Sequence, residues 1–255
     1  MRVVSLSPST SEALFAMGAG DRLVGRSRYC DYPEAVKKLP QVGGYVDPSF
    51  EAILALKPDL VVGARGPAGS AVTQRLESLG VATYFPPTES FAEIDQMLLG
   101  IGERTAHANE AKEAVRKIHE RLDAIAKAVA TKPRVRVLLV FGLEPLSVAG
   151  PGSFPNEMLE HAGAVNVVRE GNAYPTLGME HVLSLDPDVV INAAMAEERA
   201  AERLNANAPG WGRVRAVKEN KIVVLASEAV LRPGPRIAEG VAIIARALHP
   251  DVNVP

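Results

Sequence analysis

The chain has 255 residues, 47% of them hydrophobic and 23% charged, so it can bury one large core or two modest ones. A net charge of −2 gives no reason to expect binding to nucleic acid or to an anionic membrane surface. The only cysteine, Cys30, excludes an internal disulfide bond and a cysteine-based zinc site, and the five histidines do not follow a metal-ligand spacing.

The first hundred residues predict alternating strands and helices. Ser9 and Glu12 indicate a capping box for the first helix, and Asp47 with Pro48 indicates the start of the second. A wholly apolar strand such as residues 60–62 suits a parallel sheet covered on both faces. We expect strands at residues 2–6, 23–26, 60–62 and 81–85, and helices at residues 10–17, 48–57 and 70–79.

Residues 105–130 predict one long amphipathic helix. The segment has no Gly or Pro, and its apolar residues recur at spacings of three and four: Ala111, Val115, Ile118, Leu122, Ile125 and Val129. At 1.5 Å per residue it would be about 39 Å long, enough to join two small domains.

The second half of the chain resembles the first. Residues 50–64 align with residues 179–193 at a constant offset of 129, with seven identities in fifteen positions. A second pair, residues 12–19 and 157–164, shares its Glu, Leu and Gly-Ala. These internal repeats predict two related α/β lobes with parallel sheets.

The expected elements of the second half follow the same order. Residues 142–145 are expected to form a loop, and Thr176 to cap a helix that ends at residues 186–187. We expect strands at residues 135–141, 189–191 and 222–225, and further helices at residues 156–161 and 239–248.

Several motifs carry a resemblance to a known family. They are residues 2–9, 29–33, 42–45, 51–60, 141–142, 156–163 and 227–237. With these motifs the chain resembles the cobalamin-binding proteins of vitamin B12 ABC importers, within the helix-linked class of substrate-binding proteins that carry B12, haem and ferric siderophores.

The resemblance implies the class III periplasmic binding protein fold, with two Rossmann-like lobes at residues 1–104 and 132–255 joined by a helix at residues 105–131. It also implies a monomer without catalytic cofactor that holds cobalamin between the lobes and delivers it to an ABC permease dimer. Since a continuous helix resists bending, we expect the lobes to move little.

The resemblance implies a periplasmic or otherwise extracytoplasmic location. Residues 1–20 lack the basic start and apolar core of a signal peptide. From the residues alone, the chain is therefore either cytosolic or begins after a removed signal.

Candidate ligand-binding residues lie on loops that follow predicted strands, where open α/β sheets bind ligands. Flat tyrosine rings suit the face of a corrin or porphyrin, and arginines suit its amide or carboxylate groups. Arg236, just after Pro235, is interpreted as structural. The expected ligand-binding residues are Ser7, Pro8, Tyr29, Tyr45, Arg65, Phe141, Tyr174, Glu228 and Arg232.

The identity of the cargo stays open at this point. B12-binding relatives often carry Trp where this chain has Tyr45, Tyr174 and Ala64. Haem is the alternative, with Tyr45 as the candidate iron ligand, and a ferric siderophore is another.

Glu51 and Glu180 are exact repeat partners, each in the first turn of a predicted helix. The helix dipole alone favours an acid there by a few tenths of a kcal/mol. The resemblance implies a second role, in which each acid meets arginines of one permease subunit.

A nucleotide- or phosphate-binding enzyme is the remaining alternative. The glycine-rich loop at residues 63–69 precedes a predicted helix, and backbone amides in that position attract anions. However, the loop lacks the Lys-Ser/Thr of a Walker site, and the chain has no Gly-x-Ser-x-Gly motif. We therefore expect no catalytic residues.

Overall fold

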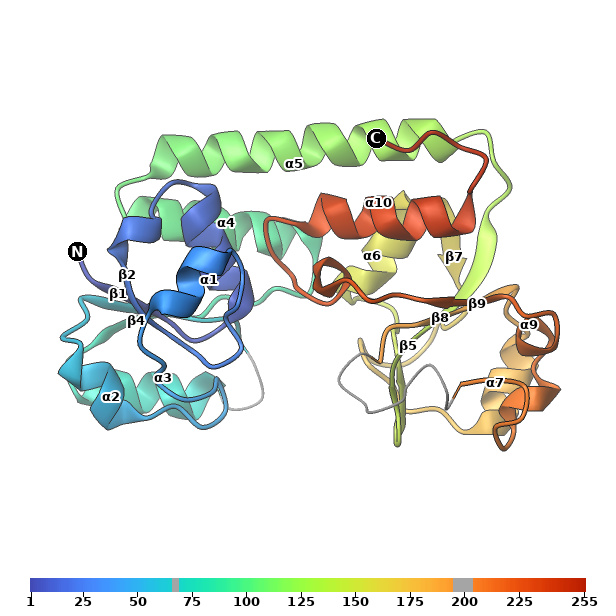
Figure 1. The fold of residues 1–255 in the computed structure, drawn as a ribbon, viewed down its shortest axis with the longest axis horizontal. Coiled ribbons are helices and arrows are strands. Elements are labelled where there is room, and N and C mark those ends of the chain that lie inside the picture. The colour runs from blue at the N-terminus through green and yellow to red at the C-terminus, as the bar shows by residue number, and fades with distance from the viewer. Residues whose placement is uncertain (66–68, 195–203) are drawn as a thin grey trace. The chain divides into compact units, whose positions relative to one another are not determined.

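The computed structural model describes residues 1–65, 69–194 and 204–255. Its helices and strands form two compact units (Figure 1). The first unit comprises residues 1–119 with 232–236, and the second comprises residues 120–231 with 237–255. The chain therefore returns to the first unit for five residues near its end.

The first unit is built on a parallel sheet in the order β2-β1-β3-β4. Helices α1 and α4 pack against each other beside it (Figure 1). Its elements are β1 (Val3–Ser5), α1 (Pro8–Ala16), β2 (Leu23–Arg26), α2 (Phe50–Ala55), β3 (Leu60–Val62), α3 (Gly69–Ser78), β4 (Ala82–Tyr84) and α4 (Phe91–Arg104), with short 3-10 helices at Gly20–Arg22 and Glu34–Lys38.

The core of this unit is aliphatic and includes every residue of strand β3, as the apolar run predicts. Residues of β1, α2 and α3 pack into one cluster with it: Val4, Leu6, Val42, Ile53, Val61, Val72, Leu76 and Val81. The predicted strands and helices of this half are confirmed, with small differences in their ends.

The second unit is built on strand β5, which pairs in parallel with β7 and β8, while β9 extends the sheet beyond β8. Helices α6 and α10 pack against each other beside the sheet (Figure 1). Its elements are β5 (Val135–Leu143), β6 (Leu146–Val148), α6 (Phe154–His161), β7 (Ala164–Asn166), α7 (Met179–Leu185), β8 (Val189–Asn192), α9 (Arg215–Lys218), β9 (Ile222–Val224) and α10 (Ile237–Leu248), with 3-10 helices at Trp211–Arg213 and Glu228–Val230.

One element of the second unit contradicts the sequence prediction. Residues 142–145 are not a simple loop, because β5 continues to Leu143 and turns back into β6 as an antiparallel hairpin. Strands β6 at Leu146–Val148 and β7 at Ala164–Asn166 were not predicted.

Helix α5 spans Ala108–Val129 and contributes residues to both units. Its predicted apolar stripe is buried at Ala111, Ile118, Leu122 and Ile125. The helix begins three residues later than predicted because helix α4 ends at Arg104 and residues 105–107 form a turn, in which Ala106 has a positive φ of 61°. Helix α4 itself was not predicted.

The internal repeat is confirmed by an equivalent set of contacts in each unit, which we call the Arg-Leu-Asp latch. In the first unit, the Arg2 amide donates to Asp59 Oδ2 at 2.6 Å and the Arg2 Nε donates to the Leu56 carbonyl at 2.7 Å.

In the second unit, the Arg136 amide donates to Asp188 Oδ2 at 3.2 Å and its Nη2 donates to the Leu185 carbonyl at 2.6 Å. Leu185 and Asp188 are the residues that the offset of 129 predicts as partners of Leu56 and Asp59. Each latch joins the start of a central strand to the end of the repeat helix, which comes later in the chain.

The predicted cap of the first helix is wrong. Helix α1 begins at Pro8 with Ser7 as its N-cap residue, since proline fits the first helical turn, where its missing N–H is not needed. Glu12 does not complete a capping box, because its side chain is 1% exposed and binds two arginines.

Two further predicted caps are also wrong. Ser49, not Asp47, caps helix α2 by accepting from the Ala52 amide at 3.2 Å. Helix α7 begins after Gly178 rather than at Thr176, and no side chain caps it. In both cases the helix begins later in the chain than the predicted cap residue would require.

Glu12 is the buried centre of an ionic cluster within the first unit. Its Oε1 lies 2.9 Å from Arg232 Nη1, and its Oε2 lies 2.9 Å from Arg236 Nε. The two arginine side chains are 12% and 19% exposed. This cluster joins helix α1 to the returning segment 232–236.

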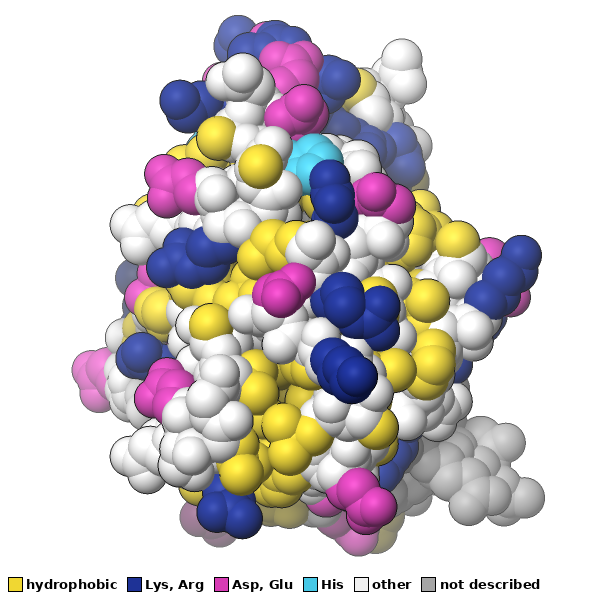
Figure 2. All heavy atoms as spheres, turned by 90° about the vertical axis from the view of Figure 1, so that its left-hand side faces the viewer, with side chains coloured by type: hydrophobic (Ala, Val, Ile, Leu, Met, Phe, Trp, Pro, Cys, Tyr) yellow, Lys and Arg dark blue, Asp and Glu magenta, His cyan; other side chains and the backbone are white. Residues whose placement is uncertain are grey.

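Charged side chains of both signs are interspersed on the face of the first unit that Figure 2 shows, with apolar side chains between them. Within the described part of the chain, no helix combines the length and the apolar character needed to cross a membrane.

We expect Glu12→Gln to lower the free energy of unfolding by about 3 kcal/mol, because it removes the charge of the carboxylate that two largely buried guanidinium groups share. Urea unfolding measures the change. The matched control is Glu113→Gln, which breaks an exposed pair with Arg116 and should cost less than about 1 kcal/mol. A loss below about 1 kcal/mol for Glu12→Gln would contradict this interpretation.

Candidate functional site

The first unit presents two tyrosines from separate loops as one aromatic pair. Tyr29 follows strand β2, and Tyr45 lies on the next loop of the same unit. Their ring centroids are 6.0 Å apart with an interplanar angle of 62°, a T-shaped arrangement that aromatic rings favour. The residues are 49% and 41% exposed, so much of each ring is open to a ligand.

An ion pair holds the two loops of this aromatic pair together. Arg28 donates from Nη2 to Asp47 Oδ2 at 2.8 Å and from Nη1 to Oδ1 at 3.2 Å. The guanidinium also lies 5.8 Å from the centre of the Tyr29 ring. Hydrogen bonding to Arg28 lowers the pKa of Asp47 below its usual value.

The far end of the Tyr29 loop is held by the buried ionic cluster. Arg232 Nη1 lies 2.8 Å from Asp31 Oδ1, and the Arg236 guanidinium lies 4.1 Å from the centre of the Tyr32 ring. Arg232, predicted to bind ligand, thus contacts two carboxylates of its own unit. Arg236 precedes helix α10 and has the structural surroundings that the sequence indicated.

Ser7 and Pro8 lie where strand β1 meets helix α1. The Ser7 side chain accepts from the Ala64 amide at 3.0 Å, which ties the ends of β1 and β3 together. Ser7 is 7% exposed and Pro8 is half-buried. Arg65 follows Ala64 with an exposed side chain, while residues 66–68 of the predicted glycine-rich loop lie outside the described residues.

The second unit carries an aromatic pair of its own. Phe141, near the end of strand β5, and Tyr174, ahead of helix α7, have ring centroids 6.0 Å apart and an interplanar angle of 70°. Tyr174 is 38% exposed. Glu228 begins a short 3-10 helix that Ser227 caps by accepting from the Ala229 amide.

The two repeat acids occupy equivalent places. Glu51 lies in the first turn of α2 and Glu180 in the first turn of α7, and both side chains are exposed. An exposed acid in a first turn is placed to meet a cation of another molecule at little cost to its own fold.

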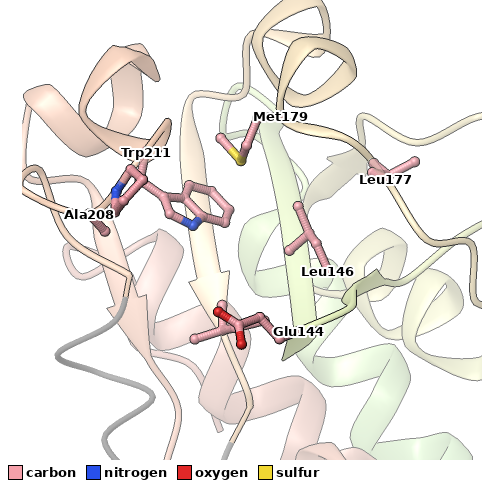
Figure 3. Close-up of a pocket in the computed structure, with 8 residues that line it drawn as sticks. Glu144, Leu146, Leu177, Met179, Ala208 and Trp211 are labelled. Carbon is pink, nitrogen blue, oxygen red and sulfur yellow. The ribbon is translucent and has the colours of Figure 1, made fainter.

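A pocket of about 330 Å³ opens in the second unit (Figure 3). The β5–β6 hairpin, the approach to helix α7 and residues 208–211 form its walls. The lining residues are Leu143, Glu144, Leu146, Leu177, Met179, Ala208, Pro209 and Trp211. No pattern in the sequence indicates this pocket, because its three walls come from distant segments.

The candidate residues of each unit include predicted and unpredicted ones. The structure brings together Tyr29 with Tyr45 and Phe141 with Tyr174, all four of which were candidates. The supporting residues Arg28, Asp31 and Asp47 were not predicted. Charged residues flanking aromatic ones on neighbouring loops were the only available signal for them. No three His, Cys, Asp or Glu side chains in the described ranges are grouped as a metal site requires.

Comparison with known proteins identifies the family. Residues 3–229 match the family model of the periplasmic binding proteins. The vitamin B12-binding protein of Yersinia pestis (strain Pestoides F) is 31% identical over 191 residues, which cover 74% of this chain and 68% of the relative.

Two solved structures share the fold. The periplasmic vitamin B12-binding protein BtuF of Vibrio cholerae is 27% identical with a TM-score of 0.81, over 97% of this chain and 96% of that one. A periplasmic haem-binding protein of Pseudomonas aeruginosa is 30% identical with a TM-score of 0.83, over 99% and 94%.

The chain is therefore an α/β substrate-binding protein with the class III fold, as predicted. It belongs to the periplasmic binding protein family, and the predicted class, that of ABC importers, is confirmed.

We expect Asp47 to titrate below the usual aspartate range of about 4, and Arg28→Gln to raise its pKa toward that range. Because folding lowers the pKa of Asp47, the Arg28–Asp47 pair stabilises the loops at pH values above the unfolded pKa of Asp47. This stabilisation is lost as the pH falls through the folded pKa. Carboxyl ¹³C NMR of Asp47 measures this. Identical titrations in both proteins would contradict the assigned role of Arg28.

Proposed function

We propose that this chain is the extracytoplasmic receptor of an ABC importer and that its cargo is cobalamin or a related corrinoid. The observation that carries the proposal is the pair of T-shaped aromatic contacts, Tyr29 with Tyr45 and Phe141 with Tyr174, in which the tyrosines are exposed and Phe141 is half-buried. Two such contacts offer flat apolar surface with a polar hydroxyl edge, which suits a macrocycle that carries amide side chains. The similarity to vitamin B12-binding proteins supports the same cargo.

On this proposal the protein binds and releases its cargo as a monomer and without chemical change. Arg65, Glu228 and Ser7 would supply hydrogen-bonding groups beside the rings, and Pro8 would add apolar contact. Arg232 would act mainly by holding Asp31. No catalytic cofactor is required, since the work of the site is recognition.

Haem is the second candidate. The chain has tyrosines at positions 45 and 174, and the phenolate of an exposed tyrosine can ligate ferric iron. The similarity to a haem-binding protein of Pseudomonas aeruginosa supports this reading as well.

Delivery would follow by docking on a permease dimer. We propose that Glu51 and Glu180 each meet a basic residue of one permease subunit, because both are exposed at equivalent places of the repeat. Opposite charges at such a contact raise the rate and specificity of association.

Titration with cyanocobalamin and with haemin, by calorimetry and visible absorbance, tests the cargo. We expect tight stoichiometric binding of cyanocobalamin. Tyr45→Ala and Tyr174→Ala should each weaken it by about two- to tenfold, since each aromatic contact contributes about 0.5–1.5 kcal/mol.

The control is Tyr84→Phe, a partly buried tyrosine that packs under Arg104, and it should leave affinity unchanged. A Soret shift with haemin that Tyr45→Phe abolishes would favour haem and count against the corrinoid. Turnover of a bound small molecule would overturn the receptor function itself.

Combined replacement Glu51→Ala with Glu180→Ala should cut transport severalfold while leaving cargo affinity unchanged, because both acids are exposed and would contact only the permease. Uptake of labelled cargo by proteoliposomes measures transport. Glu110→Ala is the matched control, since it removes an exposed acid from the first turn of helix α5. Loss of cargo affinity in the double variant would contradict the docking role.

A further inference from the structure

The pocket of the second unit is shaped by backbone as well as side chains. Gly210 has a positive φ of 80°, and a Cβ there would lie 2.8 Å from Met179 Cγ. The missing side chain therefore lets Met179 lie against residues 208–211 and face the pocket (Figure 3). Trp211 is 6% exposed, so its ring forms a firm wall rather than a mobile cover.

The size and lining of the pocket indicate what it can hold. At about 330 Å³ it lies at the low end of small-molecule sites, which span roughly 300–1,000 Å³. A whole tetrapyrrole would not fit. Leucine, methionine and tryptophan side chains dominate the walls, so the occupant is apolar and about the size of one or two large side chains.

One lining residue of the pocket is the sequence neighbour of the proposed docking acid. Met179, which lines it, directly precedes Glu180 in the first turn of helix α7. Glu144, an exposed acid at the tip of the hairpin, is a second lining residue (Figure 3). An apolar pocket with the acid Glu144 in its lining and Glu180 next to the lining residue Met179 is complementary to a peptide segment in which a large apolar residue neighbours a basic one.

We propose that this pocket is the anchor site for the permease: an extracytoplasmic loop of one permease subunit inserts a large apolar side chain here while its neighbouring basic residue meets Glu180. The inference rests on the proposed function and deepens it, since Glu180 would steer the partner and the pocket would hold it. Fully desolvated apolar anchors typically carry most of the affinity at such contacts.

The test measures binding of the cargo-free protein to the detergent-solubilised permease complex of the same importer. Leu177→Gln, which puts an amide into the pocket wall, should weaken the complex by about tenfold. Ala208→Leu, which fills the pocket, should weaken it similarly. Leu79→Gln is the matched control, a leucine that is 37% exposed in the first unit, and it should change affinity less than twofold.

A second measurement reports on the pocket directly. Trp211 is the only tryptophan of the sequence, so labelling with 5-fluorotryptophan places a single ¹⁹F probe in the pocket wall. We expect its chemical shift to change in the saturated complex with the permease. An unchanged shift there would overturn the anchor site even if a variant fails to fold.

The outcomes separate the two proposals. If Glu51→Gln with Glu180→Gln weakens the complex but Leu177→Gln and Ala208→Leu bind as the unchanged protein does, the anchor site is wrong and docking through the acids stands. If neither the acids nor the pocket matter, both proposals are wrong. Failure of the unchanged protein to bind the permease at all would overturn the proposed function, and the anchor site with it.

Discussion

A single buried carboxylate organises the candidate site of the first unit. Glu12 holds Arg232 and Arg236, which lie 220 and 224 residues further along the chain. Those arginines reach onward to Asp31 and Tyr32 in the loop that carries Tyr29. Since neither the carboxylate nor the guanidinium groups can lose a partner cheaply, each member fixes the position of the others. The cluster therefore fixes the position of this loop, and its charges contribute more to the specificity of the structure than to its net stability.

The start of the same loop, at Arg28, is held by a different kind of interaction. The Arg28–Asp47 pair is exposed, and such pairs contribute little free energy because water and salt screen them. Its effect is geometric: a two-point contact sets the approach of Tyr29 and Tyr45, and the rings complete it with their T-shaped packing. On the proposed function, this surface is ordered before cargo arrives, so less conformational entropy would be lost on binding.

The sequence predicted the features that depend on local pattern. The parallel strands and the apolar stripe of helix α5 follow from runs and spacings within about thirty residues, and the internal repeat follows from the match of residues 50–64 with residues 179–193. The capping box at Ser9 failed because Ser7 and Pro8 made a better start and because Glu12 had a stronger use elsewhere.

The contacts that build the site lay beyond such patterns. The four aromatic candidates were predicted one by one, yet their pairing depends on how separate loops approach each other. The cluster of Glu12 with Arg232 and Arg236 joins opposite ends of the chain, and the hairpin at Leu143 depends on a three-residue strand. A single sequence gives no signal for contacts at that separation.

The two copies of the repeat share contacts that the fold requires, but they differ at a position that could serve recognition. Both units keep the Arg-Leu-Asp latch, because it joins a central strand to the helix that each α/β unit needs beside it. One residue before each proposed docking acid, however, the units differ. Phe50 and Met179 each pack onto the core of their own unit, but Met179 also lines an open pocket beside Trp211. The two copies share a backbone at this position, but their side chains have different surroundings. The fold therefore does not determine the residue there, and such a position can serve recognition of a partner.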